Sequence, residues 1–328
     1  MEGPWKDKKV AVAGGAGFVG SHVVDQLVAA GARVVAVDDG SSGDWSRLDS
    51  HASVIECHHR DLIAPDLAGL FEGVDVVMDL AGKAPGLTPD EDRHDELYEA
   101  NLAVADAVLK GVIEAGVPRL LVVSSSCVYP DDAVVPTPEI SLECSEPEQA
   151  NRGYGLAKRE IERRALVASK AAGFEVAVVR PFNIYGGRDT AVGRGAHVIP
   201  SLIERLLQPG SEVLVWGSGD QTRSFMHAGD VAAAILLVAD RASSGSVVNV
   251  GSGEEYSMVQ LIDRLQMLTG TEKQLVFDPH KPEGALRKAC DASLLKRLTG
   301  FEPKVSFEDG LREMVELRLG SRLESPEG

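Results

Sequence analysis

A run of glycines between a predicted strand and a predicted helix is the first feature of the chain that could bind a ligand. Gly14, Gly17 and Gly20 stand at every third position, and Phe18 and Val19 lie between the last two. A pyrophosphate can approach the backbone where side chains are absent, and the free N–H groups at a helix N-terminus favour its negative charge. This spacing predicts a dinucleotide-binding loop.

Two adjacent carboxylates distinguish between the nicotinamide dinucleotides. Asp38 and Asp39 stand at the end of the second predicted strand, and no Arg directly follows them. A carboxylate at this place accepts a hydrogen bond from the ribose 2′-hydroxyl and repels a 2′-phosphate. We therefore expect the cofactor to be NAD rather than NADP.

A tyrosine and a lysine could supply acid–base chemistry. Tyr154 and Lys158 are four residues apart, which puts both on one face of a helix. An ammonium group there would lower the pKa of the phenol from about 10 towards neutrality and favour a phenolate base. Ser125, Ser126 and Cys127 follow another predicted strand, at the sheet edge where doubly wound folds bind ligands. We predict that these residues share one active site.

A parallel sheet is the architecture that would position these residues. Short β-branched runs alternate with amphipathic helical patterns, which indicates an α/β fold with a Rossmann-type doubly wound parallel sheet. Strands are expected at 9–13, 33–38, 74–80, 120–125, 175–180, 212–216 and 247–250, and helices at 19–30, 95–115, 154–172, 199–207, 228–239 and 257–268. We expect an NAD-binding domain over residues 1–185, completed by 228–254, a smaller C-terminal substrate-binding lobe over 186–227 and 255–320, and a flexible tail over 321–328.

Composition and charge narrow the range of partners. The chain has 328 residues, and its 33 Lys and Arg against 50 Asp and Glu give a net charge of −17, which disfavours nucleic acid. The longest apolar run is far shorter than the about 18 residues that span a bilayer, so no membrane partner is expected. Reduced thiols and a cytoplasmic location are indicated by four cysteines without a C-x-x-C pair, at positions 57, 127, 144 and 290.

Together these motifs resemble the extended short-chain dehydrogenase/reductase family, which contains nucleotide-sugar epimerases and dehydratases. The resemblance runs from Val10 to about Leu317. It rests on the glycine loop, Asp61-Leu62, Asp79-Leu80-Ala81-Gly82, Ser125, Tyr154 with Lys158, Arg180 to Gly186, Gly219 to Phe225 and Asn249 to Ser252.

The resemblance implies a role for several of these residues. Tyr154 and Lys158 would act with Ser125 on the 4-hydroxyl of the sugar, and Asp61 would contact the adenine. Asn183 and Arg223 would hold the substrate diphosphate. The resemblance also implies that Leu62, Leu80, Ala81 and Asn183 contact the cofactor. It implies that Ser126 contacts the substrate.

Two residues favour one branch of this family. Cys127 and His197, the latter within Gly195 to Pro200, are similar to the GDP-sugar branch of GDP-mannose 3,5-epimerases and GDP-fucose synthases. In that branch the Cys is the base, the residue at the His197 position is the opposing acid, and Arg287 fits a C-terminal substrate arginine. The 4,6-dehydratases instead have Asp and Glu after the catalytic Ser or Thr, where this chain has Ser126 and Cys127.

These residues predict an epimerase that regenerates its cofactor. Removal of hydride from C4 onto NAD would make a ketone that acidifies the neighbouring carbons, a Cys127 thiolate would remove a proton from one face, and His197 would deliver one to the other. The expected substrate is a nucleoside-diphosphate sugar, most readily GDP-mannose, inverted at C5 or at C3 and C5. The alternatives are a 4-epimerase, a 4,6-dehydratase, a reductase similar to GDP-fucose synthase, and a non-catalytic NAD-binding protein.

Two further expectations concern metals and assembly. His58 and His59 lie beside Cys57 in sequence, but neighbouring strand residues point to opposite faces, so no metal site is predicted. The family resemblance implies a homodimer.

Overall fold

The computed structural model describes residues 3–84, 93–143, 145–189, 196–280 and 284–324. Seven strands form the central sheet, and every neighbouring pair in it is parallel. In spatial order they are β11 (Ser246–Val250), β6 (Glu175–Pro181), β5 (Arg119–Val123), β4 (Val76–Asp79), β1 (Lys9–Ala13), β2 (Arg33–Asp38) and β3 (Glu56–His59). The predicted α/β fold with a doubly wound parallel sheet is confirmed.

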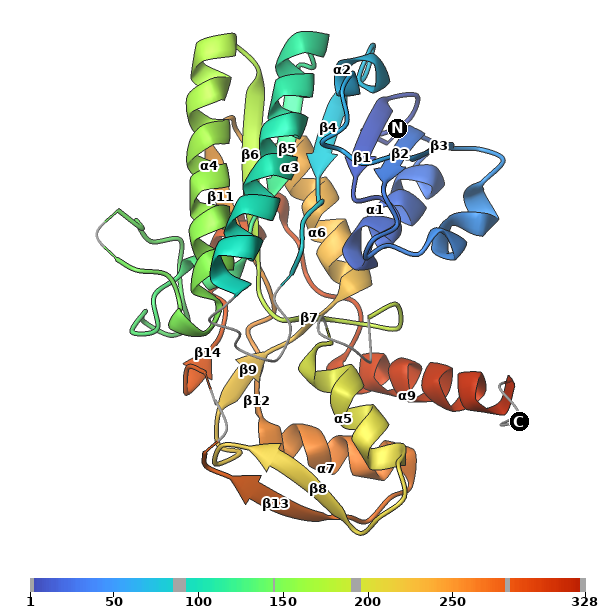
Figure 1. Cartoon of the computed structure of the whole chain (residues 1–328), viewed down its shortest axis with the longest axis vertical. Coiled ribbons are helices and arrows are strands. Elements are labelled where there is room, and N and C mark those ends of the chain that lie inside the picture. The colour runs from blue at the N-terminus through green and yellow to red at the C-terminus, as the bar shows by residue number, and fades with distance from the viewer. Residues whose placement is uncertain (1–2, 85–92, 144, 190–195, 281–283, 325–328) are drawn as a thin grey trace.

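Helices cover both faces of this sheet (Figure 1). One face packs against α2 (Leu67–Leu70), α3 (His94–Ala115) and α4 (Arg152–Ala172), and the other against α1 (Phe18–Ala29), α6 (Ala228–Arg241) and α8 (Ser293–Thr299). In β1, Val10 and Val12 join one of these cores, whereas Ala11 and Ala13 join the other. Side chains of a strand alternate between its faces, so a sheet covered on both sides needs an apolar residue at every position.

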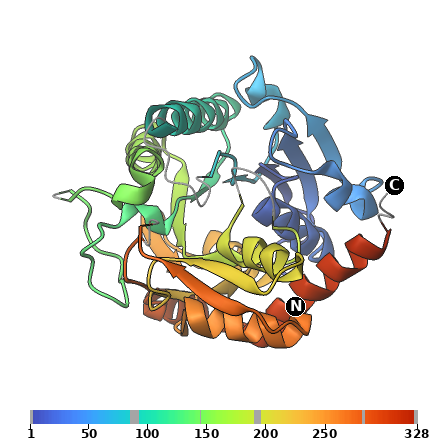
Figure 2. The ribbon, with the colours of Figure 1, turned by 60° about the horizontal axis from the view of Figure 1, so that its bottom comes forward.

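A smaller lobe lies beyond the carboxyl ends of the strands (Figures 1 and 2). Its own apolar core is formed by Ile199, Val213, Leu261, Phe307 and other buried side chains. The lobe contains α5 (Val198–Leu207), β8 (Glu212–Trp216), β9 (Thr222–Ser224), β12 (Glu255–Ser257), α7 (Met258–Thr269), β13 (Gln274–Asp278), β14 (Arg287–Lys288) and α9 (Phe307–Glu324). Short strands β7 (Ile184–Tyr185) and β10 (Met226–His227) pair where the chain passes between the sheet and this lobe.

The predicted elements match the structure closely, with differences at their ends. The expected strand over 120–125 stops at Val123, because Ser125 caps the short 3₁₀ helix η3 (Ser126–Val128). Two more short 3₁₀ helices are η1 (Trp45–His51) and η4 (Gln149–Asn151). α9 continues to Glu324, through the first half of the segment predicted to be a flexible tail, and 325–328 lie outside the described residues. None of the described helices is long and apolar enough to cross a membrane.

Candidate active site

A cavity of about 1030 Å³ opens between the carboxyl ends of the strands and the smaller lobe. This volume is at the upper end of the range for small-molecule sites. The cavity is lined by every predicted cofactor residue, namely Gly14, Gly17, Phe18, Val19, Gly20, Asp38, Asp39, Asp61, Leu62, Leu80, Ala81, Tyr154, Lys158 and Asn183. It is also lined by all but one of the predicted catalytic and substrate residues, namely Ser125, Ser126, Cys127, His197 and Arg223.

The backbone of the glycine loop packs closely against the first turn of α1. Gly14 has a φ of +77°, and a Cβ at Gly20 would lie 1.9 Å from the Gly14 carbonyl oxygen. Gly17 occupies the N-cap position of α1 and supplies no side-chain cap to the first N–H groups of that helix. The loop therefore allows the close backbone approach that a diphosphate requires, and the uncapped start of α1 offers it N–H donors.

Carboxylates line the cavity beside this loop. Asp38 is buried at the end of β2, and its two oxygens accept hydrogen bonds from the N–H groups of Ala16, at 3.1 Å, and Gly40, at 2.9 Å. Burial raises the pKa of this carboxyl above its usual value. The described lining residues at the ends of β1, β2 and β3 include three acidic side chains, those of Asp38, Asp39 and Asp61. None of these described lining residues is Lys or Arg. This arrangement fits a free ribose 2′-hydroxyl and disfavours a 2′-phosphate.

The tyrosine and lysine of α4 lie together, although not as the spacing predicted. Lys158 Nζ lies 5.6 Å from the centre of the Tyr154 ring and donates to the Val123 carbonyl at 2.8 Å. The pKa of the Tyr154 phenol is raised by burial, rather than lowered by Lys158, while a hydrogen bond with Ser125 acts in the opposite direction. The expected depression of the phenol pKa is therefore absent from this structure, because burial favours the neutral phenol.

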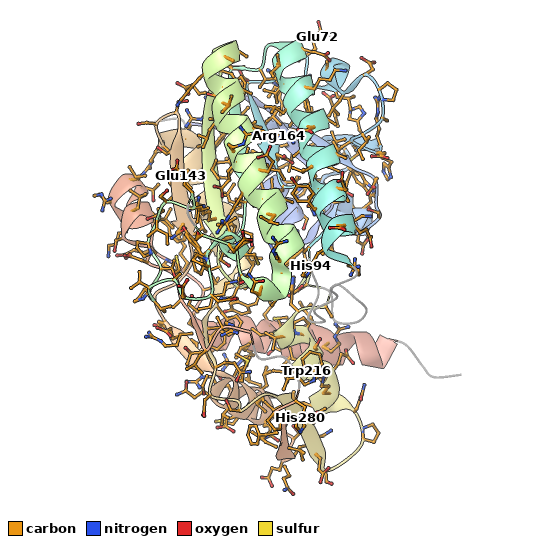
Figure 3. The ribbon with its side chains drawn as sticks, turned by 60° about the vertical axis from the view of Figure 1, so that its left-hand side comes forward. Glu72, His94, Glu143, Arg164, Trp216 and His280 are labelled. Carbon is orange, nitrogen blue, oxygen red and sulfur yellow. The ribbon has the colours of Figure 1, made fainter. Side chains whose placement is uncertain are left out.

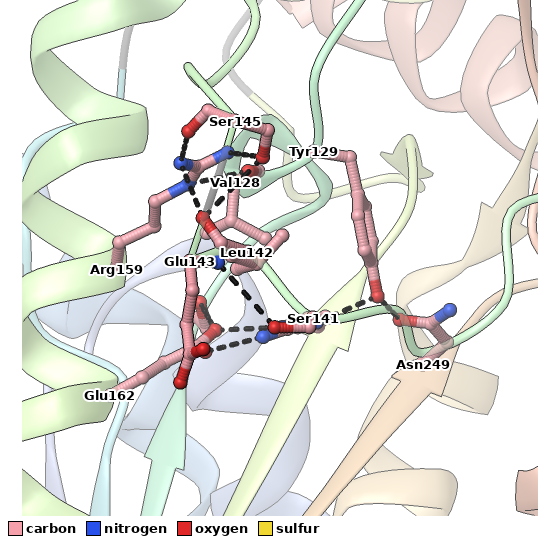
Figure 4. Close-up of polar contacts among 11 residues, drawn as sticks. Val128, Tyr129, Ser141, Leu142, Glu143, Ser145, Arg159, Glu162 and Asn249 are labelled. Atoms are coloured by element: carbon pink, nitrogen blue, oxygen red, sulfur yellow. Dashed lines mark hydrogen bonds and ion pairs between the residues drawn. The ribbon is translucent and has the colours of Figure 1, made fainter. Parts of the chain in front are cut away.

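A buried polar network fixes the turn that carries Ser125 and Cys127. The guanidinium of Arg180 binds both carboxylate oxygens of Glu162, at 2.9 and 2.6 Å, and donates to the Tyr129 hydroxyl. Tyr129 in turn donates to Asn249 at 2.6 Å, as Figure 4 shows. Both charged side chains of the ion pair are 6% exposed. Such a fully bonded network holds η3 at the end of β5.

A second arginine anchors the segment that follows this turn. Arg159 on α4 donates to the backbone carbonyls of Val128, at 2.8 Å, Leu142, at 3.2 Å, and Ser145 (Figure 4). One guanidinium thus ties η3 to the loop that leads into η4. Glu148, which precedes η4, lies in the cavity wall as a result.

The Cys127 thiol faces two charged side chains. Its own N–H donates to Ser125 Oγ at 3.2 Å, and Lys288 Nζ lies 3.9 Å from its sulfur. Burial, reinforced by the negative charge of Glu148, raises the pKa of the thiol to about 12, although Lys288 favours the thiolate. The cysteine is therefore a neutral thiol here, whereas the sequence predicted a thiolate.

His197 is paired with a carboxylate that sequence reasoning missed. The imidazole Nδ1 lies 2.8 Å from Asp189 Oδ1, and the carboxyl side chain of Asp189 is 2% exposed. Burial alone would lower the pKa of the imidazole, but the hydrogen bond and charge of Asp189 outweigh burial and raise it. Because Asp189 occupies Nδ1, Nε2 is the ring nitrogen that can exchange a proton with a ligand.

The structure does not bring Arg287 to the cavity. Arg287 does not line the cavity, and its guanidinium binds the carboxylate of Glu255 on the neighbouring strand. Its neighbour Lys288 points into the cavity instead. Both belong to β14, and adjacent side chains of a strand point to opposite faces.

Other residues complete the wall on the side of the smaller lobe. Asn183 donates to the Ser224 carbonyl at 2.9 Å, and Arg223 donates to the Ala285 carbonyl at 2.7 Å. Arg205 lies with its guanidinium 5.8 Å from the ring centre of Trp216, which Figure 3 labels within this lobe. Sequence reasoning did not name Arg205, because its place on α5 facing β8 depends on tertiary packing.

The histidines beside Cys57 have other partners. His59 stacks on Trp45, with ring centres 3.9 Å apart, and His51 lies 2.9 Å from a carboxylate oxygen of Asp25. In the part of the chain that the structure describes, no group of three His, Cys, Asp or Glu side chains could hold a metal ion.

Fold and site together define a dinucleotide-dependent enzyme with a serine, tyrosine and lysine at the end of a Rossmann-type sheet. The model of the "NAD dependent epimerase/dehydratase family" matches residues 10–251, and the chain belongs to this family. NAD is the family's cofactor, and the glycine loop and Asp38 fit it.

Individual relatives narrow the class further. The chain is 33% identical over 313 residues to a probable GDP-L-fucose synthase 1 of Oryza sativa subsp. japonica, with 94% of this chain and 91% of that protein covered. Its structure is similar to UDP-glucose 4-epimerase of Thermotoga maritima solved with UDP-glucose, at 29% identity and a TM-score of 0.86, with 96% and 99% of the chains covered. It is also similar to MoeE5 solved with UDP-glucose and NAD, at 28% identity and a TM-score of 0.81 with the same coverage. The relatives are nucleotide-sugar epimerases and related enzymes.

Proposed function

We propose that this protein is an NAD-dependent epimerase of a nucleoside-diphosphate sugar, and that it inverts a carbon next to a transient 4-ketone. The observation that carries the proposal is that Cys127 and His197 line the same cavity as Ser125, Tyr154 and Lys158. A simple 4-epimerase needs no second pair of acid and base, so a thiol and an imidazole in addition to the tyrosine favour inversion at C5 or at C3 and C5.

Each of these residues would have a separate role in the reaction. Bound NAD would supply the reversible transfer of hydride at C4. Tyr154, hydrogen-bonded to Ser125, would hold and exchange the proton of the 4-hydroxyl. Cys127 would remove the proton of the neighbouring carbon, and His197, whose protonated form Asp189 favours, would return one to the other face.

The substrate we propose is a GDP-hexose, with GDP-mannose the first to test. Arg205, Arg223 and Lys288 place three cations in the wall on the side of the smaller lobe, where a diphosphate needs positive charge. The similarity to GDP-L-fucose synthases supports a guanine nucleotide over a uridine nucleotide. We further propose that the protein acts as a cytoplasmic homodimer, which a sizing experiment tests.

The decisive experiment incubates the NAD-loaded protein with GDP-mannose in D₂O, without added cofactor. NMR should show deuterium at C5, or at C3 and C5, together with an epimerised product. If neither carbon takes up deuterium while the protein binds the nucleotide sugar, the inversion is wrong. Replacement of Cys127 by Ser should abolish the exchange, whereas a 4-epimerase would survive this replacement.

A second candidate is a net reductase of a nucleotide 4-keto sugar, and the similarity to GDP-L-fucose synthases favours it. Such an enzyme consumes one reduced dinucleotide for each sugar. Loss of absorbance at 340 nm with a GDP-4-keto-hexose identifies this activity, and the epimerase shows none. The acidic wall around Asp38 predicts that NADPH would serve poorly in either case.

A further inference from the structure

In the reaction proposed above, Lys288 serves only as positive charge in the cavity wall and Glu148 has no role, yet the two side chains form an ion pair next to the Cys127 thiol. Glu148 and Lys288 form this pair, and their side chains are 10% and 16% exposed. Lys288 Nζ donates to the Glu148 carboxylate and lies 3.9 Å from the Cys127 sulfur, so the carboxylate and the thiol flank the same ammonium group. η3, the residue before η4 and β14 supply one member each, so only the folded chain assembles this trio.

Other charged and titratable groups face the trio from the elements around it. Ser125 and Tyr154 lie on the side of the thiol that faces α4, and Lys158 adds positive charge from the same helix. Arg223 faces Lys288 from β9. Among these groups Glu148 is the carboxylate, and its negative charge adds to burial in raising the pKa of the thiol.

A thiol must lose its own proton before it can remove one from carbon. We propose that Glu148 accepts the Sγ proton of Cys127 while Lys288 stays beside the thiolate that forms, so that both are positioning residues acting through Cys127. The S–H bond breaks, an O–H bond forms on Glu148, and no electron is transferred. This inference rests on the proposed function and deepens it.

The total charge of the trio stays the same in this transfer. A thiol, a carboxylate and an ammonium group sum to zero, and so do a thiolate, a carboxylic acid and an ammonium group. An uncompensated charge is costly away from water, whereas a transfer that keeps the trio neutral creates none. Loss of the same proton to bulk water would leave Glu148 and the thiolate as two neighbouring anions with one cation.

The test separates a proton acceptor from a mere negative charge. In Glu148→Gln the carboxylate that disfavours the thiolate is gone, so alkylation of Cys127 by iodoacetamide at neutral pH should become about tenfold faster. Incorporation of solvent deuterium into the sugar should nevertheless become at least about tenfold slower, because the proton has lost its acceptor. In Lys288→Met both rates should fall. Mass spectrometry of the Cys127 peptide and NMR of the sugar measure the two rates.

The matched control is Glu146→Gln, since Glu146 is exposed, pairs with Arg152 and precedes Glu148 by two residues. Both rates should stay at their wild-type values there. Thermal melting and bound NAD show that each variant is folded, and Glu148→Asp, which keeps an acceptor, should exchange faster than Glu148→Gln.

Two results would overturn the proposal, and a third would overturn the proposed function without testing the role of Glu148 as a proton acceptor. Faster alkylation with unchanged deuterium incorporation in Glu148→Gln would overturn it, because Glu148 would then act only as a charge. Unchanged alkylation would also overturn it. If the wild type incorporates no deuterium from any GDP-hexose, the proposed function fails by itself. Alkylation then tests only whether both charges act on the thiol: Glu148→Gln should be faster and Lys288→Met slower, and any other pattern overturns the proposal.

Discussion

The two sides of the cavity are built in different ways. On the dinucleotide side, the glycine loop and Asp38 belong to one strand–loop–helix–strand unit of consecutive residues. On the substrate side, Cys127, His197 and Lys288 come from segments that are far apart in the chain. A local unit has a spacing that can be read in the sequence, whereas the second arrangement exists only after the smaller lobe packs over the sheet.

The charges of the two sides differ as well. Carboxylates line the wall next to the glycine loop, and Arg205, Arg223 and Lys288 line the wall of the smaller lobe. The chain as a whole carries a net charge of −17. A few cations concentrated in one wall can therefore attract a phosphorylated ligand even though the protein surface is acidic.

The largest effect is expected at Tyr154, which lies where the two sides meet. Tyr154→Phe removes the group that exchanges the proton of the 4-hydroxyl, and kcat should fall on the order of a thousandfold, or ~4 kcal/mol of activation free energy. Tyr98→Phe is the matched control, because Tyr98 is a partly buried residue of α3 that packs against the core and does not line the cavity. If kcat of Tyr154→Phe stays within tenfold of the wild-type value, Tyr154 does not exchange the proton of the 4-hydroxyl.

A substitution in the glycine loop tests the dinucleotide side alone. In Gly20→Ala the new Cβ would lie 1.9 Å from the Gly14 carbonyl oxygen, so the loop must shift. We expect loss of bound NAD and a decrease of ~1–3 kcal/mol in the free energy of unfolding. Calorimetry and the NAD content of the purified protein measure both. The same substitution at Gly116, a C-cap whose Cβ would contact nothing within 4 Å, should leave the NAD content unchanged.

A pair of arginines tests the substrate side. Arg223 lines the cavity and Arg287 lies outside it, so Arg223→Ala should raise KM for the nucleotide sugar about tenfold to a hundredfold. Arg287→Ala should change KM less than about twofold, because it breaks only an exposed ion pair with Glu255. Steady-state kinetics with both variants measure this difference, and equal increases in KM would show that Arg287 reaches the substrate.

The smallest effect concerns the pH dependence of His197. Asp189 raises the pKa of this imidazole, so Asp189→Asn should move the alkaline limb of the epimerisation rate towards lower pH. The pairing also adds stability, which is complete below the pKa of an unfolded histidine and is lost as pH rises through the folded pKa. NMR titration of the His197 ring and unfolding curves at several pH values check both. An unchanged ring pKa would contradict the role of Asp189.

Particular residues show where sequence reasoning succeeded and where it could not. β1 and β2 have the predicted bounds. Each is a short apolar run rich in valine, and Gly14 after β1 and Asp38 at the end of β2 mark where the buried strand must stop. Sequence reasoning named Arg287 of β14, whereas its neighbour Lys288 lines the cavity. A two-residue strand has no pattern that tells which side chain faces inward. Asp189 gave no signal either, as an aspartate in a glycine-rich loop is common on any surface.

The sequence by itself therefore determined the family, the parallel sheet and the residues of the dinucleotide loop, because each depends on short-range spacing and on side chains repeated along one element. Only the tertiary structure decided the ionisation of the site. The neutral thiol of Cys127, the ammonium of Lys158 bound to a carbonyl and the pairing of His197 with Asp189 all depend on burial and on neighbours that are distant in the chain. Burial and charge proximity act through space, and no spacing in a sequence specifies them.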